Sequence, residues 1–263
     1  MKRVAWQAII FDFDGVVVES GEIKTQAFVN LYQGYGETVM AAVAQYHSLN
    51  GGMSRYQKFR YFQETLLEKP PLTPEEEQQL DRRFSELVVE AVIASEAVPG
   101  AAELIRKEAG RIPLFVASGT PETELNNIVI RRGLASYFTE VRGSPTPKQK
   151  LIADILASHS LLPERVLMIG DALIDYQSAR VNNVSFLGRD LFDSWRSDHS
   201  SKPLDSSAGC KLRRLYQRFR RPGAGPSLGY RFGFLFPFNR RYSVSGNKDR
   251  SRRDLWHDCP LCH

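Results

Sequence analysis

Cysteine is absent from the first 209 residues of this 263-residue sequence, because Cys210, Cys259 and Cys262 all lie near its end. This absence excludes a disulfide framework from most of the chain and is typical of a reducing compartment. No apolar run approaches the roughly 20 residues that a membrane-spanning helix needs. The opening stretch, MKRVAWQAIIFDFDG, lacks the cleavage site and uninterrupted apolar region of a signal peptide. We therefore expect a cytoplasmic protein without membrane association.

Glutamate is absent from residues 190–263, which carry 15 Lys and Arg against 7 Asp, whereas residues 1–189 carry 20 against 23 Asp and Glu. The net charge of +5 therefore arises in this basic tail, and it is no sign that the rest of the chain binds nucleic acid. The tail lacks helical or strand periodicity, and RPGAGPSLGYRFGFLFPFNRRY resembles a loop with aromatics. It is a basic arm for nucleic acid or an acidic partner, a disordered segment, or the product of a reading-frame shift. We favour the last two.

The end of the tail, HDCPLCH, has the spacing of a haem-attachment motif and could offer zinc ligands. Haem attachment requires export, and a structural zinc site requires four ligands enclosed by a fold. We therefore expect no metal site at His257, Cys259, Cys262 and His263.

Short apolar runs separated by helical patterns predict an α/β fold, a Rossmann-like parallel sheet with crossover helices. The predicted strands are Ala8–Phe11, Leu114–Ala117, Val166–Ile169 and Val184–Leu187, with a possible fifth at Tyr137–Val141. The predicted crossover helices are Ala101–Ala109, Glu122–Arg132, Lys148–Ser158 and Asp175–Asn182.

About a hundred residues between the first two runs carry almost no strand signal and predict an all-helical insertion. The clearest helix start combines Thr73 as N-cap, a following proline and Glu76 closing a capping box. The predicted helices are Ile23–Tyr32, Thr38–Leu49, Tyr56–Leu67 and Pro74–Ser95. We expect a catalytic core of residues 1–16 and 98–189, a helical domain of residues 17–97, and the tail of residues 190–263.

Polar residues follow the predicted strands, and the carboxyl ends of parallel strands share one edge of the sheet. In isolation, Asp12 and Asp14 could simply form a turn. Four strand ends that all carry polar groups instead predict a site, and the chemistry that uses such a set is phosphoryl transfer through a carboxylate nucleophile. The expected set is Asp12, Asp14, Ser118, Gly119, Lys148, Asp171 and Asp175.

Residues 7–189 resemble the haloacid dehalogenase-like hydrolases, through four motifs in that family's order. These are DFDGV, VASGT, the lysine of PTPKQK, and GDALID. The resemblance implies that Asp12 is the nucleophile and Asp14 the general acid and base. It also implies a Mg²⁺ cofactor and a helical insertion that acts as a type 1 cap.

The resemblance further implies that Ser118, Gly119 and Lys148 bind the transferring phosphate. Asp12, the backbone carbonyl of Asp14 and Asp171 would hold Mg²⁺, with Asp175 in support. Three alternatives stay open: Lys150 could replace Lys148, Asp175 could only cap its helix, and Thr120 could bind phosphate through its backbone or only cap the next helix.

The stretch YHSLNGGMSRYQKFRYF has a pair of glycines that should separate two helices and form a flexible loop. Arg55 and Lys58 follow this loop and could meet the anionic end of a substrate, with His47 as a further candidate. Alternatively, the stretch is a solvated turn with surface charges. The aromatic residues at helical spacing are expected in the core; they are Tyr56, Phe59 and Phe62.

The sequence therefore predicts a Mg²⁺-dependent phosphatase that acts on a small phosphorylated metabolite, such as a sugar phosphate or a phosphoglycolate-like acid. One alternative is a sugar-phosphate mutase, since GMSR resembles a loop of the β-phosphoglucomutases. VVESGEIK, however, lacks the threonine and histidine that those enzymes carry after their first motif. The alternative from another class is a protein that has lost catalysis and binds nucleic acid or an acidic partner through its tail.

Overall fold

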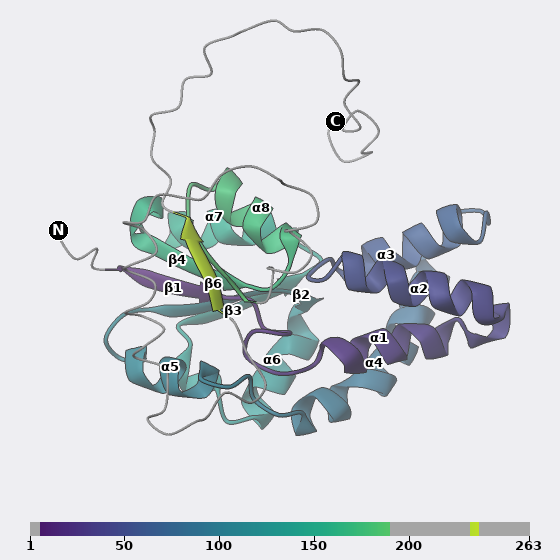
Figure 1. Cartoon of the computed structure of the whole chain (residues 1–263), viewed down its shortest axis with the longest axis horizontal. Coiled ribbons are helices and arrows are strands. Elements are labelled where there is room, and N and C mark those ends of the chain that lie inside the picture. Colours follow the sequence, from purple (N-terminus) through teal and green to yellow (C-terminus); the bar gives the residue numbers. More distant parts are fainter. Residues whose placement is uncertain (1–5, 190–231, 237–263) are drawn as a thin grey trace, which may run out of the picture.

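The computed structural model describes residues 6–189 and the strand Phe232–Phe236, and it places a six-stranded sheet at the centre of the fold (Figure 1). The strand order is β3-β2-β1-β4-β5-β6, and the first five strands run parallel. Sheets of this kind bind ligands at the carboxyl ends of their strands. The parallel strands are β1 (Ala8–Phe11), β2 (Leu114–Pro121), β3 (Glu140–Ser144), β4 (Val166–Gly170) and β5 (Ser185–Arg189).

Helices cover both faces of this sheet because alternate side chains of each strand point to opposite faces. In β1, Ile9 and Phe11 join one hydrophobic cluster, while Ala8 and Ile10 join another. The first cluster includes side chains of α5 (Ala101–Glu108) and α6 (Glu122–Arg131), and the second includes side chains of α7 (Lys148–Ser158) and α8 (Leu173–Val181). In Figure 1, α5 and α6 lie on one side of the sheet and α7 and α8 on the other. The predicted α/β fold is therefore confirmed.

Between β1 and α5 the chain is mainly helical, and we call residues 21–94 the helical insert. The insert lies beside the sheet, at the right in Figure 1. Thr73 and Glu76 form the predicted capping box at the start of its longest helix. The helices are α1 (Gly21–Leu31), α2 (Glu37–Leu49), α3 (Arg55–Tyr61) and α4 (Pro74–Ala94), and a π-helical turn (Phe62–Leu66) extends α3.

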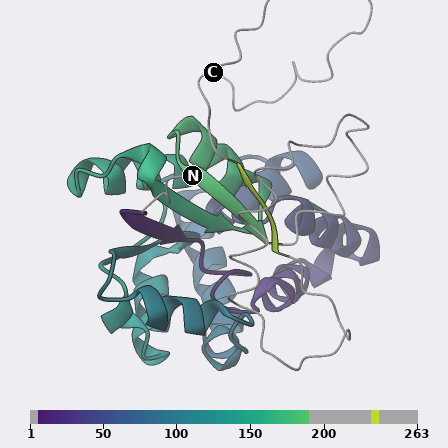
Figure 2. The ribbon, with the colours of Figure 1, turned by 60° about the vertical axis from the view of Figure 1, so that its left-hand side comes forward.

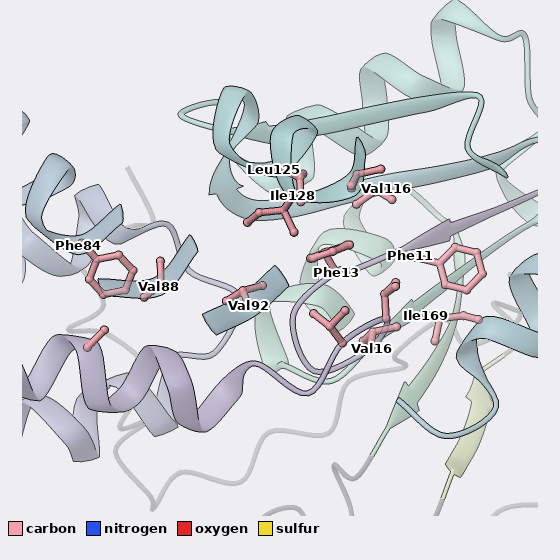
Figure 3. Packing of buried hydrophobic residues seen from close by; sticks show 14 of the residues in the cluster. Phe11, Phe13, Val16, Phe84, Val88, Val92, Val116, Leu125, Ile128 and Ile169 are labelled. Carbon is pink, nitrogen blue, oxygen red and sulfur yellow. The ribbon is translucent and has the colours of Figure 1, made fainter. Parts of the chain in front are cut away.

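The insert and the sheet share one hydrophobic core. Phe84, Val88 and Val92 of α4 lie in a row that leads toward Phe13 and Val16, next to β1 (Figure 3). Within the insert, three fully buried phenylalanines pack against one another: Phe28, Phe59 and Phe84. The prediction that Phe59 and Phe62 belong to the core is confirmed, and Tyr56 is partly buried against the same cluster.

The two connections between sheet and insert run side by side. Val18 forms a β-bridge with Ala97, and the backbone N–H of Val98 donates to the carbonyl of Val17 at 3.0 Å. Because both connections lie next to the end of β1, the insert meets the sheet at the edge where Asp12 and Asp14 are found.

Two local predictions were wrong. The strand predicted at Tyr137–Val141 exists as β3 but begins later, at Glu140, because residues 135–137 form a 3-10 turn. In the tail, residues 232–236 form a strand, β6, rather than the expected loop (Figure 2). β6 pairs with β5, and the two strands run antiparallel. The outer side of an edge strand offers unpaired backbone groups to a further strand.

The remaining predictions for the tail, including its disorder, its partners and the ligand set near His257, concern residues outside the described ranges. The predicted domain boundaries stay predictions. Over residues 6–189 and 232–236, no helix is both long and apolar enough to cross a bilayer.

Candidate active site

The ends of the parallel strands bring together the residues that the sequence singled out. Asp12 follows β1, Ser118 lies in β2, and Asp171 follows β4. Lys148, the first residue of α7, directs its Nζ toward the same place, 3.0 Å from Asp12 Oδ1. Asp12, Ser118 and Lys148 are all buried.

Asp12 is a carboxylate held in place at one oxygen. Its Oδ1 accepts a hydrogen bond from the backbone N–H of Phe13 at 2.8 Å as well as facing Lys148. Burial raises the pKa of Asp12 to about 7, and the neighbouring charges of Asp175 and Asp14 add to the rise while Lys148 opposes it. Because burial outweighs the charge of Lys148, a bound cation would stabilise the ionised form of Asp12.

Asp14 has the opposite electrostatic environment. Although burial alone would raise its pKa, Lys24 at 2.5 Å and the hydroxyls of Ser20 at 2.6 Å and Thr120 at 2.8 Å lower the pKa of Asp14 to about 2. Two carboxylates with pKa values displaced in opposite directions are typical of sites that divide nucleophilic and proton-transfer roles.

Lys24 was missed in the sequence. It lies on α1 of the helical insert, and its Nζ also bonds Thr120 Oγ1 at 2.7 Å. Nothing around residue 24 indicates a site, and the only available signal was its nearness in sequence to the DFD stretch. The side chain of Thr120 binds Asp14, and Pro121 rather than Thr120 is the N-cap of α6. A phosphate contact through the backbone of Thr120 stays a prediction.

The choice between two lysines is clear in the geometry. Lys148 Nζ lies between Asp12 and Asp175, at 3.0 and 2.5 Å, while Lys150 is exposed and pairs with Asp154. Although burial opposes it, the two carboxylates raise the pKa of Lys148, so its charge persists. Lys150 lies outside the site.

Asp175 does cap the start of its helix, as one alternative held. Its Oδ2 accepts from the backbone N–H groups of Asp171 and Ala172, both at 3.1 Å, while its Oδ1 faces Lys148. Asp175 is therefore also part of the charged cluster, and capping does not exclude a supporting role there.

Three carboxylates could hold a metal ion. Oxygens of Asp12, Asp171 and Asp175 all lie within 4.8 Å of one another. Burial, together with Asp12 and Asp175, raises the pKa of Asp171 well above its usual value. Such a crowded set of carboxylate oxygens fits a hard divalent cation, which would relieve their mutual repulsion.

Two glycines are required by close approaches within the site. Gly15 has a φ of +74°, and a Cβ there would lie 1.9 Å from Asp171 Oδ2. A Cβ at Gly119 would lie 2.4 Å from the carbonyl oxygen of Gly52, in the loop between α2 and α3. The predicted break at Gly51 and Gly52 is therefore real, and this loop of the insert rests on the end of β2.

Lys58 and His47 form a buried pair in the insert. Lys58 Nζ lies 2.9 Å from His47 Nδ1, and Lys58 is only 2% exposed. Burial lowers the pKa of His47 to about 3, and burial with the charge of Lys24 lowers the pKa of Lys58 to about 7. His47 is thus neutral and accepts the hydrogen bond from Lys58.

Arg55, which the sequence suggested as a cation for the anionic end of a substrate, is already bound by acidic side chains. It is the first residue of α3, it is buried, and its guanidinium is bonded to Glu124, Asp81 and Ser85. The alternative of a solvated turn is wrong for both Arg55 and Lys58, since neither side chain reaches the surface.

A cavity of about 80 Å³ lies between the sheet edge and the insert. Asp12, Asp14 and Asp171 line it from the sheet side, and Arg55 and Lys58 line it from the insert. This volume admits a small molecule and is below that of drug-sized ligand sites.

Comparisons with known proteins agree with this geometry. A family model described as haloacid dehalogenase-like hydrolase matches residues 6–182. The chain is 26% identical over 183 residues to a phosphoglycolate phosphatase of Synechococcus elongatus, with 66% of this chain and 79% of that enzyme covered. It is 25% identical over 184 residues to a phosphorylated carbohydrates phosphatase of Thermotoga maritima, with 66% and 80% covered.

Among solved structures, a predicted phosphatase from Clostridium acetobutylicum is similar with a TM-score of 0.59 and 18% identity, over 80% of this chain and 99% of that one. At this identity the likeness shows the fold alone. The family match, by contrast, spans more than half of the chain and includes Asp12, Lys148 and Asp171. The chain therefore belongs to the haloacid dehalogenase-like hydrolases.

Proposed function

We propose that this chain is a Mg²⁺-dependent phosphatase that hydrolyses a small phosphorylated metabolite through an aspartyl-phosphate on Asp12. The charged cluster at the sheet edge carries the proposal, because Lys148 Nζ lies 3.0 Å from Asp12 Oδ1 and carboxylate oxygens of Asp12, Asp171 and Asp175 lie within 4.8 Å of one another. Asp12 is buried with a pKa raised to about 7, while Asp14, two residues away, has a pKa lowered to about 2. A cation beside Asp12 would keep this carboxylate ionised as the nucleophile, and Asp14 must gain a proton before it can act as the acid.

In the first step, Asp12 attacks phosphorus, and the bond from phosphorus to the leaving oxygen breaks. Lys148, Ser118 and the backbone of Gly119 bind the phosphoryl oxygens, and Asp14 gives a proton to the leaving oxygen. Because Asp14 is ionised in the free site, it must take up this proton as the substrate binds. In the second step, Asp14 removes a proton from water, which attacks phosphorus and releases Asp12.

The residues that would hold Mg²⁺ are Asp12, Asp171 and the backbone carbonyl of Asp14, with Asp175 in support. The close approach of the three carboxylates supports this arrangement. When bound, Mg²⁺ offsets the repulsion between an anionic nucleophile and an anionic phosphate and orients the latter.

The helical insert acts as a cap that carries the contacts to the rest of the substrate. The loop at Gly52 rests on the site, and Lys58 lines the cavity from the insert. Lys58, with His47 behind it, is suited to bind the non-reacting end of an anionic substrate. The small cavity favours a sugar phosphate or a phosphoglycolate-like acid, in line with the names of the curated relatives. The absence of cysteine before residue 210 agrees with a cytoplasmic location.

The test is phosphate release from p-nitrophenyl phosphate and from a panel of phosphorylated metabolites, with Mg²⁺ and with EDTA. Asp12→Asn should lower kcat by several powers of ten, and EDTA should abolish activity. The control is Asp154→Asn, which removes an exposed carboxylate and should change nothing. An Asp12→Asn variant with more than about a tenth of the original kcat would overturn the nucleophile assignment. Conversion of a sugar phosphate into its isomer without phosphate release would favour the mutase.

A further inference from the structure

The guanidinium of Arg55 lines the cavity, yet acidic side chains already bind it. Its two terminal nitrogens bond both carboxylate oxygens of Glu124, one of them at 2.9 Å. Nη1 also lies 3.1 Å from Asp81 Oδ1 and 2.8 Å from Ser85 Oγ. A bidentate pair of this kind is among the stronger polar contacts that an arginine makes.

Burial and packing fix this arrangement. The side chains of Arg55 and Glu124 are 3% and 8% exposed, and the guanidinium lies 4.5 Å from the centre of the Phe84 ring. Ser85 Oγ donates a further hydrogen bond to Glu124 Oε2 at 2.5 Å. A substrate anion that sought Arg55 would therefore have to displace a buried carboxylate from it.

The charge at this end of the cavity follows directly. One arginine faces two carboxylates, those of Glu124 and Asp81, so the group as a whole attracts no anion. Among the described residues that line the cavity, Lys58 is the cation that bonds a neutral side chain, His47, whereas carboxylates bond Lys24 and Arg55. Lys58 is thus the cation of the insert through which the cavity can attract an anionic group.

We propose that Glu124, together with Asp81, neutralises Arg55 and thereby restricts the site to substrates with a single phosphate group. This inference rests on the proposed phosphatase activity. The non-reacting end of the substrate would carry hydroxyl groups or one carboxylate, which Lys58 can bind. A second phosphate, with its two negative charges, would meet Arg55 with its charge already offset by Glu124, and would gain no cation in exchange for its lost hydration.

The experiment measures inhibition of p-nitrophenyl phosphate hydrolysis by matched pairs of compounds. The pairs are ribulose 5-phosphate with ribulose 1,5-bisphosphate, and fructose 6-phosphate with fructose 1,6-bisphosphate. The unaltered protein should bind each monophosphate at least about tenfold more tightly than its bisphosphate. Glu124→Gln keeps the shape and the bond to Ser85 but removes the charge. This variant should shift the ratio of the two affinities, monophosphate to bisphosphate, in favour of the bisphosphate by about tenfold to a hundredfold. A change of this size corresponds to one charge-assisted hydrogen bond.

Glu90→Gln is the matched control. Glu90 of α4 pairs with Arg131 of α6, so it is another ion pair between insert and sheet domain, but an exposed one away from the cavity. It should leave the ratio unchanged. Asp81→Asn changes a partly exposed carboxylate and should shift the ratio in the same direction as Glu124→Gln. It provides the test if the Glu124→Gln variant does not fold.

The outcomes separate this inference from the proposed function. No hydrolysis of p-nitrophenyl phosphate by the unaltered protein with Mg²⁺ would contradict the phosphatase itself. Equal affinity for both members of each pair would overturn the inference alone. So would a Glu124→Gln variant that weakens both members by the same factor, or a Glu90→Gln variant that reproduces its shift, because Glu124 would then only join insert to sheet.

Discussion

Lys24 Nζ lies 2.5 Å from Asp14 Oδ2, so a helix of the insert binds the second aspartate of the sheet edge. Thr120 Oγ1 closes the triangle, at 2.7 Å from Lys24 and 2.8 Å from Asp14. The orientation of the proposed acid and base therefore depends on residues from two different parts of the chain.

Lys24→Met should lower kcat for an alkyl phosphate by about tenfold to a hundredfold, because a poor leaving group depends on a proton from a well-oriented Asp14. Hydrolysis of p-nitrophenyl phosphate, which has a good leaving group, should fall much less. Steady-state kinetics on both substrates check this. Lys69→Met removes an exposed lysine of the insert and is the control. Equal losses on both substrates would show that Lys24 supports only the fold.

Lys148→Met should lower kcat/KM by about a hundredfold or more, the usual cost of removing a donor aimed at developing charge. Lys150→Met, two residues along the same helix, should stay within about twofold, because Lys150 is exposed and pairs with Asp154. Kinetics with p-nitrophenyl phosphate measure both. Similar activity in the two variants would remove Lys148 from the phosphate site.

Mg²⁺ should raise the melting temperature of the unaltered protein by about 5–10 °C at a hundredfold excess over its Kd. Asp171→Asn should lose most of that rise. Without Mg²⁺ the same variant should melt above the unaltered protein, because it relieves the repulsion that raises the pKa of Asp171. Thermal denaturation followed by circular dichroism tests both expectations. A full Mg²⁺ response in Asp171→Asn would exclude Asp171 as a ligand.

Lys58 should make stability depend on pH. Burial lowers its pKa from 10.5 to about 7, so between these values the unfolded chain binds a proton that the folded chain does not. The contribution of Lys58 to the free energy of unfolding therefore rises with pH across this window.

Lys58→Met removes this contribution. It should raise the melting temperature more at pH 6 than at pH 9.5, by about 4 °C or more. Lys150→Met should show no such difference, since Lys150 is exposed. A gain from Lys58→Met that is the same at both pH values would mean that folding does not lower the pKa of Lys58.

Local sequence predicted four of the five parallel strands, the start of α4 and the two aspartates that follow β1. The apolar run before Asp12 could be buried only as a strand of the sheet, and Thr73 with Glu76 marks a helix start through contacts three residues apart. Both signals depend on near neighbours, so the sequence carried them without knowledge of the rest of the fold.

The tertiary structure alone decided which charges meet. Helical spacing places Arg55 and Lys58 on α3 but does not say that Glu124, 69 residues further along, binds the first while His47 binds the second. Likewise, only the position of α1 over the sheet edge brings Lys24 to Asp14. Ion pairs between distant residues depend on how whole helices pack, because a shift of a few ångströms exchanges one partner for another. The charge that the cavity presents to a substrate was therefore not readable from the residues one by one.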